Sequence, residues 1–251
     1  MVLNSPELYN NNIPLTVPED SVLNSLMYDF FSYRYFKNKE QRRMIIRMLK
    51  RDSDIILSLP KNCGRTMCFQ LPMLITERKV SIVFVGLKSR IEGQMNRLRR
   101  GNHCVEFIDS STNARGWTRI VNKIQRYCRM LSGKNIVLYM TPDIAQTVLF
   151  QKFVHYLVNQ NQLGYLVVDE SYHEDYWFLN SAREYRGLRK LKKKYENIPW
   201  IVAISNGNTN VIARIKTTLC LGARRNGLPR DEIPCFGLFN YTLVFRGFRQ
   251  F

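Results

Sequence analysis

Six short, continuous apolar runs alternate with longer stretches of helical periodicity along most of this chain. The runs are Asp54–Leu59, Ser81–Val85, Val105–Ile108, Ile136–Met140, Tyr165–Val168 and Ile201–Ile204. Strands that are buried on both faces are apolar throughout rather than at every second position, so these runs predict central strands of a parallel sheet. The stretches between them are long enough for crossover helices. The sequence therefore predicts an α/β fold in which a parallel β-sheet is sandwiched between helices.

The alternating pattern also suggests how the chain is divided. Residues 1–20 are polar and rich in asparagine and proline, which is typical of a flexible N-terminal arm. Residues 21–222 carry the alternation and are expected to form one lobe. The pattern stops near Gly222, and residues 223–251 are expected to form a linker followed by a short apolar tail.

An excess of basic residues limits the partners that the protein can have. The chain carries 38 Lys and Arg against 20 Asp and Glu, which gives a formal net charge of +18. A domain this basic is expected to meet polyanions, most often nucleic acid; the alternative is a solvated basic surface with no such partner. No apolar run approaches the length of a membrane span, so no membrane partner is expected.

The metal-ligand residues of the chain are scattered. Its six cysteines include no C-x-x-C pair, and its three histidines lie far apart. Structural zinc sites need four ligands at short, paired spacings. We therefore expect reduced cysteines and no zinc.

One predicted helix, at residues 115–131, separates its charges from its apolar side chains. Its apolar residues fall on one face, and the opposite face carries Arg115, Arg119, Lys123, Arg126 and Arg129. A basic stripe of this kind is either a nucleic-acid track or a solvated face, and the overall charge favours the track. We expect Arg115, Arg119, Lys123 and Arg126 to contact nucleic acid. The segment Arg183–Lys194, with seven basic residues and one Glu, is expected to add to the same basic surface.

The segment LPKNCGRTMCFQLP, residues 59–72, has the shape of a phosphate-binding loop. It follows an apolar run and leads into a helical stretch, with Gly64, Arg65 and Thr66 in the order that such loops use. A later predicted strand ends at Asp169 and Glu170, where a carboxylate would hold Mg²⁺ and its neighbour would orient the attacking water. The acidic pair could equally start a helix, and the loop alone is compatible with a working nucleotide site, a disabled one or a coincidence.

The order of several short segments resembles that of the RecQ-type ATP-dependent DNA helicases, in their first RecA-like lobe. The resemblance covers residues 21 to about 222. The segments that carry it are Phe31–Lys37 with Gln41, Leu59–Pro72, Val83–Gln94, Leu138–Asp143, Asp169–Tyr172, Tyr176-Trp177, Glu184–Leu188 and Ala203–Gly207. They stand where that family has F-G-Y-x-x-F-R-x-x-Q, M-P-T-G-G-G-K-S-L-C-Y-Q-L-P, S-P-L-x-S-L-x-x-D-Q, L-Y-x-T-P-E, D-E-A-H, an aromatic-rich loop, E-Y-x-x-L and A-L-T-A-T.

The resemblance implies a RecA-like fold of the P-loop NTPase type and a site for ATP with Mg²⁺. On these positions it assigns nucleotide binding to Lys37, Gln41, Asn62, Cys63, Gly64, Arg65 and Thr66. Thr66 and Asp169 would hold Mg²⁺, and Arg65, Asp169 and Glu170 would take the catalytic roles. Tyr176 and Trp177 would meet single-stranded DNA. The family further implies a nuclear protein of DNA repair and recombination.

Several departures from the family pattern point to impaired catalysis. Arg65 replaces the lysine, Asn62 and Cys63 replace glycines, and Asp169–Tyr172 reads D-E-S-Y. The chain stops soon after Phe239-Asn240-Tyr241, which resembles the start of the second lobe, so residues 223–251 are expected to hold a truncated beginning of that lobe.

These features favour a degenerate RecQ-like lobe that binds single-stranded or forked DNA, binds ATP weakly or not at all, and does not unwind DNA. Two alternatives stay open at this stage. One is a protein-interaction scaffold whose partner is a RecQ-family relative, and the other is an ATPase or helicase that a second lobe completes in trans.

Overall fold

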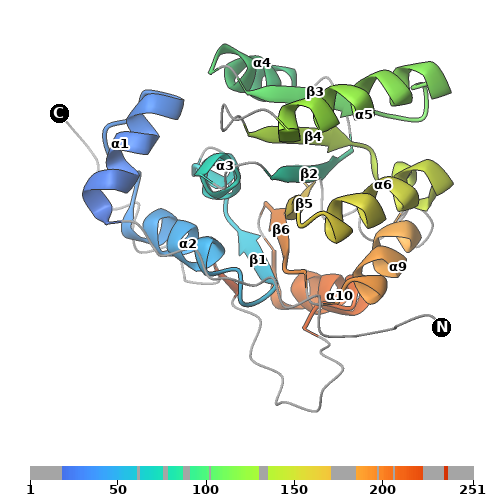
Figure 1. Ribbon diagram of the computed structural model, residues 1–251. Helices are drawn as coiled ribbons and strands as arrows, with labels where there is room; N and C mark the ends of the chain where they lie inside the picture. Colours follow the sequence, from blue (N-terminus) through green and yellow to red (C-terminus); the bar gives the residue numbers. More distant parts are fainter. Residues whose placement is uncertain are drawn as a thin grey trace, which may run out of the picture.

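The computed structural model describes residues 19–60, 63–75, 79–86, 91–101, 103–129, 135–170, 185–196, 198–205, 207–222 and 235–236. At its centre is a seven-stranded sheet with the strand order β3-β4-β2-β5-β6-β1-β7, in which every recorded pairing is parallel (Figure 1). The strands are β1 Ile55–Ser58, β2 Val80–Val85, β3 Cys104–Ile108, β4 Ile136–Met140, β5 Leu163–Glu170, β6 Trp200–Ile204 and β7 Cys235–Phe236.

The first six strands confirm the six apolar runs, each within two residues at either end. Strands β1, β2, β4 and β6 are buried at every position, as expected for strands that are covered on both faces. Strand β7 was not predicted, because two residues are too few for any periodicity. It pairs with β1 and thereby brings part of the expected linker segment into the same sheet.

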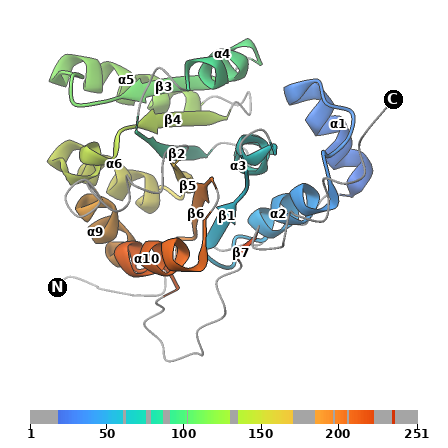
Figure 2. The ribbon, with the colours of Figure 1, turned by 180° about the vertical axis from the view of Figure 1, so that it is seen from behind.

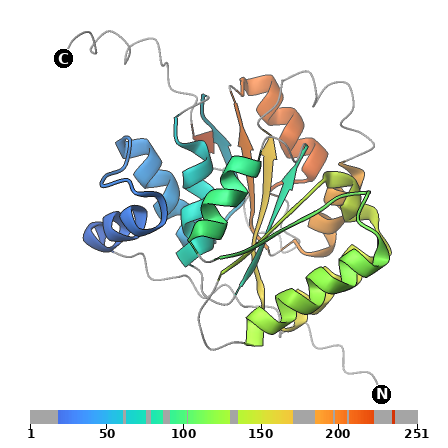
Figure 3. The ribbon, with the colours of Figure 1, turned by 90° about the horizontal axis from the view of Figure 1, so that it is seen from above.

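Two layers of helices cover the sheet, as Figures 1 and 2 show from opposite sides. One face is covered by α1 Asp20–Phe31, α2 Lys39–Lys50, α3 Arg65–Ile75 and α4 Glu92–Arg100. The other face is covered by α5 Ala114–Arg129, α6 Val148–Asn159, α9 Arg186–Lys194 and α10 Thr209–Leu219, with the 3-10 turn η3 Pro142–Gln146 ahead of α6. Each layer forms its own apolar core against the sheet, and Figure 3 shows the twisted strands between the two layers. The predicted α/β sandwich is confirmed.

Helices α2, α6 and α10 each begin at a residue whose side chain caps the helix. The Asn38 side chain accepts a hydrogen bond from the Gln41 N–H at the start of α2, and Asn208 does the same for the Val211 N–H at the start of α10. None of the helices among the described residues is both long enough and apolar enough to cross a membrane.

A buried ion pair lies at the edge of the sheet where the strands begin. Lys192 of α9 and Asp54, which precedes β1, are 2% and 7% exposed, and the Lys192 ammonium lies 2.7 Å from Asp54 Oδ1. The same carboxylate accepts hydrogen bonds from the backbone N–H groups of Trp200 and Gly222. The ammonium also donates to the carbonyl oxygens of Glu196 and Ile198. The pair therefore links α9, β1, β6 and the end of α10. Most of the hydrogen-bonding capacity of its two side chains is satisfied.

This arrangement corrects the expectation that Arg183–Lys194 adds only to a basic surface. Lys192 lies on the same side of α9 as Leu188 and Leu191, four and one residues before it, and all three are buried. Its charge is compensated inside the protein. The helical spacing of these residues was the signal that could have indicated its burial.

We expect Lys192→Ala to lower the free energy of unfolding by about 3–5 kcal/mol, because removing one partner leaves the Asp54 carboxylate buried and uncompensated. Urea denaturation followed by circular dichroism measures the change. The matched control is Lys193→Ala at the exposed neighbouring position, where a change within about 0.5 kcal/mol is expected. Equal losses in the two variants would contradict a structural role for the buried pair.

Candidate nucleotide-binding loop and basic helix face

The parallel register brings the predicted loop and the predicted carboxylate to one edge of the sheet. Ser58 of β1 pairs with Ile204 of β6, which in turn pairs with Glu170 of β5. The carboxyl ends of these three strands are therefore level. Asp169 lies one residue before this end, opposite Val85 of β2. Ligands of open α/β sheets bind at this edge, so the loop between β1 and α3 stands in the position expected of a phosphate-binding loop.

Gly64 gives the loop a backbone conformation that other residues rarely adopt. Its φ is +79°, in the left-handed region that favours glycine. A Cβ atom at this position would lie 2.3 Å from Nε2 of Gln41, so the Gln41 side chain packs directly on the loop. Gln41 is 2% exposed; its Nε2 donates to the Gly64 carbonyl oxygen, and its Oε1 accepts from the Lys37 N–H. The structure thus brings the predicted residues Lys37, Gln41 and Gly64 together.

Arg65 is the first residue of α3, and its side chain turns inward. Only 10% of the side chain is exposed. One terminal nitrogen donates to the Leu59 carbonyl oxygen at 3.4 Å, and Nε lies 3.8 Å from Oδ1 of Asp169. The guanidinium therefore lies between the ends of β1 and β5.

Asp169 is a buried carboxylate near the end of β5. Its side chain is 1% exposed, and neither carboxylate oxygen has a hydrogen-bond partner among the residues that the structure describes. Burial raises the pKa of Asp169 to about 6, and the positive charge of Arg65 works against this rise.

A hydrogen-bonded group of polar side chains lies close to Asp169. Gln70 Nε2 donates to the Tyr139 hydroxyl at 3.0 Å and to Gln94 Oε1 at 3.2 Å. Burial raises the pKa of Tyr139, and the charge of Asp169 raises it further. All three residues belong to the segments that carry the family resemblance, but no local pattern predicts that they contact one another, because they come from α3, α4 and β4.

The described residues do not fit the Mg²⁺ site that the resemblance implies. Mg²⁺ requires oxygen ligands at about 2.0–2.1 Å in an octahedron. The Asp169 carboxylate, which would supply one of them, instead faces the guanidinium of Arg65. No cluster of three or more His, Cys, Asp or Glu side chains suited to a metal occurs in the part of the chain that is described. No step through a metal ion is therefore derived for this site.

The structure describes fewer contacts for the remaining predicted site residues. Thr66 and Cys63 are half-buried beside Arg65 and Gly64, and the Cys63 N–H donates to the Pro60 carbonyl oxygen. Glu170 is the last residue of β5. Asn62, Tyr176 and Trp177 lie outside the described residues. The roles given to all of these residues stay predictions.

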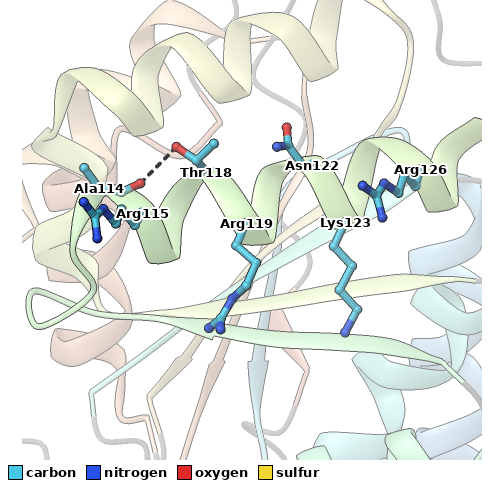
Figure 4. A pocket seen from close by; sticks show the side chains of 7 residues that line it. All are labelled: Ala114, Arg115, Thr118, Arg119, Asn122, Lys123 and Arg126. Carbon is cyan, nitrogen blue, oxygen red and sulfur yellow. Dashed lines mark hydrogen bonds between the residues drawn. The ribbon is translucent and has the colours of Figure 1, made fainter.

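Helix α5 has the two faces that its sequence predicts. Trp117, Ile120 and Ile124 are buried in the core beneath it. The opposite face is exposed and forms a shallow hollow of about 700 Å³ (Figure 4), whose charged lining residues are Arg115, Arg119, Lys123 and Arg126. Lys123 is paired with Glu106 of the edge strand β3, and this hydrogen bond raises the pKa of Lys123. The side chains of the three arginines have no hydrogen bond or ion pair with any other described residue.

The basic face and the loop do not form one site. Helix α5 packs on one face of the sheet and α3 packs on the other. Figures 1 and 2 place α5 over the β3 edge and α3 near β1 and β2. The α5 face and the strand-end loop are therefore two separate surfaces.

We expect the unfolding free energy of the wild-type protein, taken relative to Asp169→Asn, to decrease as pH rises. A carboxyl group whose pKa is raised in the folded state, here from 3.8 to about 6, contributes stability below pH 4 that is lost as pH rises through 6. The difference between the two proteins should fall by about 2–3 kcal/mol between pH 4 and pH 7.5, measured by urea denaturation at each pH. A difference that is constant with pH would show that Asp169 titrates normally.

Comparison with known proteins supports the resemblance seen in the sequence. The family model described as DEAD/DEAH box helicase matches residues 38–210. The chain is 24% identical over 225 residues to the ATP-dependent DNA helicase Q5 of Rattus norvegicus, covering 89% of this chain and 22% of that protein. It is 25% identical over 191 residues to the ATP-dependent DNA helicase Q-like 4B of Arabidopsis thaliana, covering 76% of this chain and 16% of that protein.

The fold is likewise similar to that of a solved helicase. The crystal structure of the DUF1998 helicase MrfA bound to DNA matches with a TM-score of 0.61 at 14% identity, covering 82% of this chain and 29% of that chain. This chain spans about a fifth of the length of the Q5 relative. The match to the family model, the RecQ-type relatives and the parallel sheet with its strand-end loop agree, and the chain belongs to the DEAD/DEAH box helicase family as a helicase-like domain related to the RecQ helicases.

Proposed function

We propose that this helicase-like domain binds nucleic acid without sequence preference through the basic face of α5. The observation that carries the proposal is the exposed row Arg115, Arg119, Lys123 and Arg126, which lies opposite the buried face of the same helix. Guanidinium groups suit phosphate oxygens because they present several donors in a fixed plane. A surface of this kind reads the backbone rather than the bases.

The length of the row matches several phosphates. Arg115 and Arg126 are eleven residues apart, which corresponds to roughly 16 Å along a helix. A nucleic-acid strand carries one phosphate per about 3.4 Å of a B-form axis, so four or five phosphates span the row. Lys123 is already partly neutralised by Glu106, and we expect the three arginines to contribute more than it does.

The relatives support DNA as the polyanion. The Q5 and 4B relatives are named ATP-dependent DNA helicases, and the MrfA structure contains DNA. We propose single-stranded or forked DNA as the preferred form, with Tyr176 and Trp177 as stacking residues. We further propose that catalysis is impaired, because the basic residue of the loop is turned toward Asp169 and the Leu59 carbonyl.

We expect the variant Arg119→Gln/Arg126→Gln to bind single-stranded DNA more weakly and with a shallower salt dependence. Each phosphate contact that is lost should reduce the slope of log affinity against log salt by about 0.7 on a single strand. Fluorescence anisotropy with two labelled oligonucleotides of unrelated sequence measures affinity over a salt series, and both sequences should behave alike.

The matched control is Arg97→Gln/Arg100→Gln, which removes the same charge from exposed positions of α4 on the other face of the sheet. The control should keep the wild-type slope. Equal reductions in the two variants would mean that total charge rather than the α5 face determines binding. Wild-type protein that fails to bind at low salt would favour the interaction scaffold.

Hydrolysis of ATP by the wild-type chain should not exceed that of Asp169→Asn, because the Asp169 carboxylate is paired with the guanidinium of Arg65. Phosphate release in the presence of Mg²⁺ and single-stranded DNA measures both proteins. Faster release by the wild type would contradict impaired catalysis. A rate that rises only after a second helicase lobe is added would favour completion in trans.

A further inference from the structure

We infer that the guanidinium of Arg65 is a resident cation, which takes the place of the divalent metal ion that a phosphate-binding loop of this kind uses. The loop would then hold its shape without Mg²⁺ and would not bind a metal–nucleotide complex through Asp169. The inference concerns the strand-end loop and is independent of DNA binding by α5, which lies on the other face of the sheet.

The position of the guanidinium is the first observation. It is held between two strand ends by the Leu59 carbonyl oxygen, 3.4 Å from a terminal nitrogen, and by Asp169, 3.8 Å from Nε. The side chains of Arg65 and Asp169 are 10% and 1% exposed, so water screens their charges little. The guanidinium cannot lose its charge at any physiological pH.

The lack of other partners for Asp169 is the second observation. Within the described part of the chain, neither of its carboxylate oxygens accepts a hydrogen bond, and Arg65 is the cation recorded beside it. A buried carboxylate needs a counter-charge, which a metal or an arginine can supply. A divalent ion bound to the same carboxylate would lie close to the guanidinium and would be repelled by it, so the two cations exclude each other.

The packing of Gln41 is the third observation. Its carboxamide lies against Gly64 and is bonded both to the Gly64 carbonyl oxygen and to the Lys37 N–H. These contacts hold the loop against α2 with groups of the chain itself. Within the protein, the Arg65 guanidinium of the loop is thus paired with Asp169, and the Gly64 carbonyl oxygen accepts a hydrogen bond from Gln41.

The test is to remove the resident cation and look for a metal site. Mn²⁺ is the probe, and its binding to the whole chain is measured by electron paramagnetic resonance in the absence of nucleotide. Arg65→Met removes the charge and preserves much of the side-chain length, and Arg65→Gln is a second uncharged variant in case the first does not fold. Arg99→Met is the matched control, because the Arg99 guanidinium also donates to a backbone carbonyl, that of Val105, but forms no ion pair with a carboxylate of the described residues.

We expect the wild type and Arg99→Met to lack a one-to-one Mn²⁺ site. The Arg65 variants should gain such a site, with an affinity at least about tenfold above the wild type. Adding Asp169→Asn to either variant should abolish the gain. A wild-type Mn²⁺ site that is lost in Asp169→Asn would overturn the inference, and so would Arg65 variants that fold and gain no site. DNA binding measured on the same proteins should be unchanged, so that a failure here is distinct from a failure of the proposed function.

Discussion

A parallel sheet that is covered by helices on both faces can place charged side chains only where its strands begin or end. This constraint determines where the buried charges of the domain lie. Strands β1, β2, β4 and β6 are buried along their length, and the helices of each layer pack apolar side chains onto the sheet. The charged residues that enter the interior, Asp54 with Lys192 and Asp169 with Arg65, do so where strands begin or end. Burial makes each of these charges dependent on a partner.

The two buried ion pairs differ in the number of hydrogen bonds that their carboxylates accept. Asp54 is surrounded by donors, since Lys192, Trp200 and Gly222 all bond to it. Asp169 has a guanidinium at 3.8 Å and no hydrogen bond from any described residue. The Asp54–Lys192 pair links several elements through its hydrogen bonds, whereas the Asp169 carboxylate lies at the carboxyl ends of the strands with the Arg65 guanidinium as its neighbouring charge.

The basic helix follows from the same layered construction. Helix α5 needs one apolar face to cover the sheet, and its other face is free to carry charge. Because α5 lies on the layer opposite α3, the charged face is separated from the strand-end loop. The basic face and the strand-end loop can therefore change independently in sequence without sharing a surface.

The sequence alone determined the sheet, the helix α5 and the family, because continuous apolar runs, helical periodicity and ordered motifs are all local patterns. It also placed Gln41, Gly64, Arg65 and Asp169 in one site through those motifs. The tertiary structure decided what these residues do to one another. Whether Arg65 points outward or toward Asp169, and whether Lys192 is exposed or paired with Asp54, depends on contacts between segments more than a hundred residues apart, which no local pattern records. The pairing of β7 with β1 is of the same kind, since two residues join the sheet only because the fold brings them beside β1.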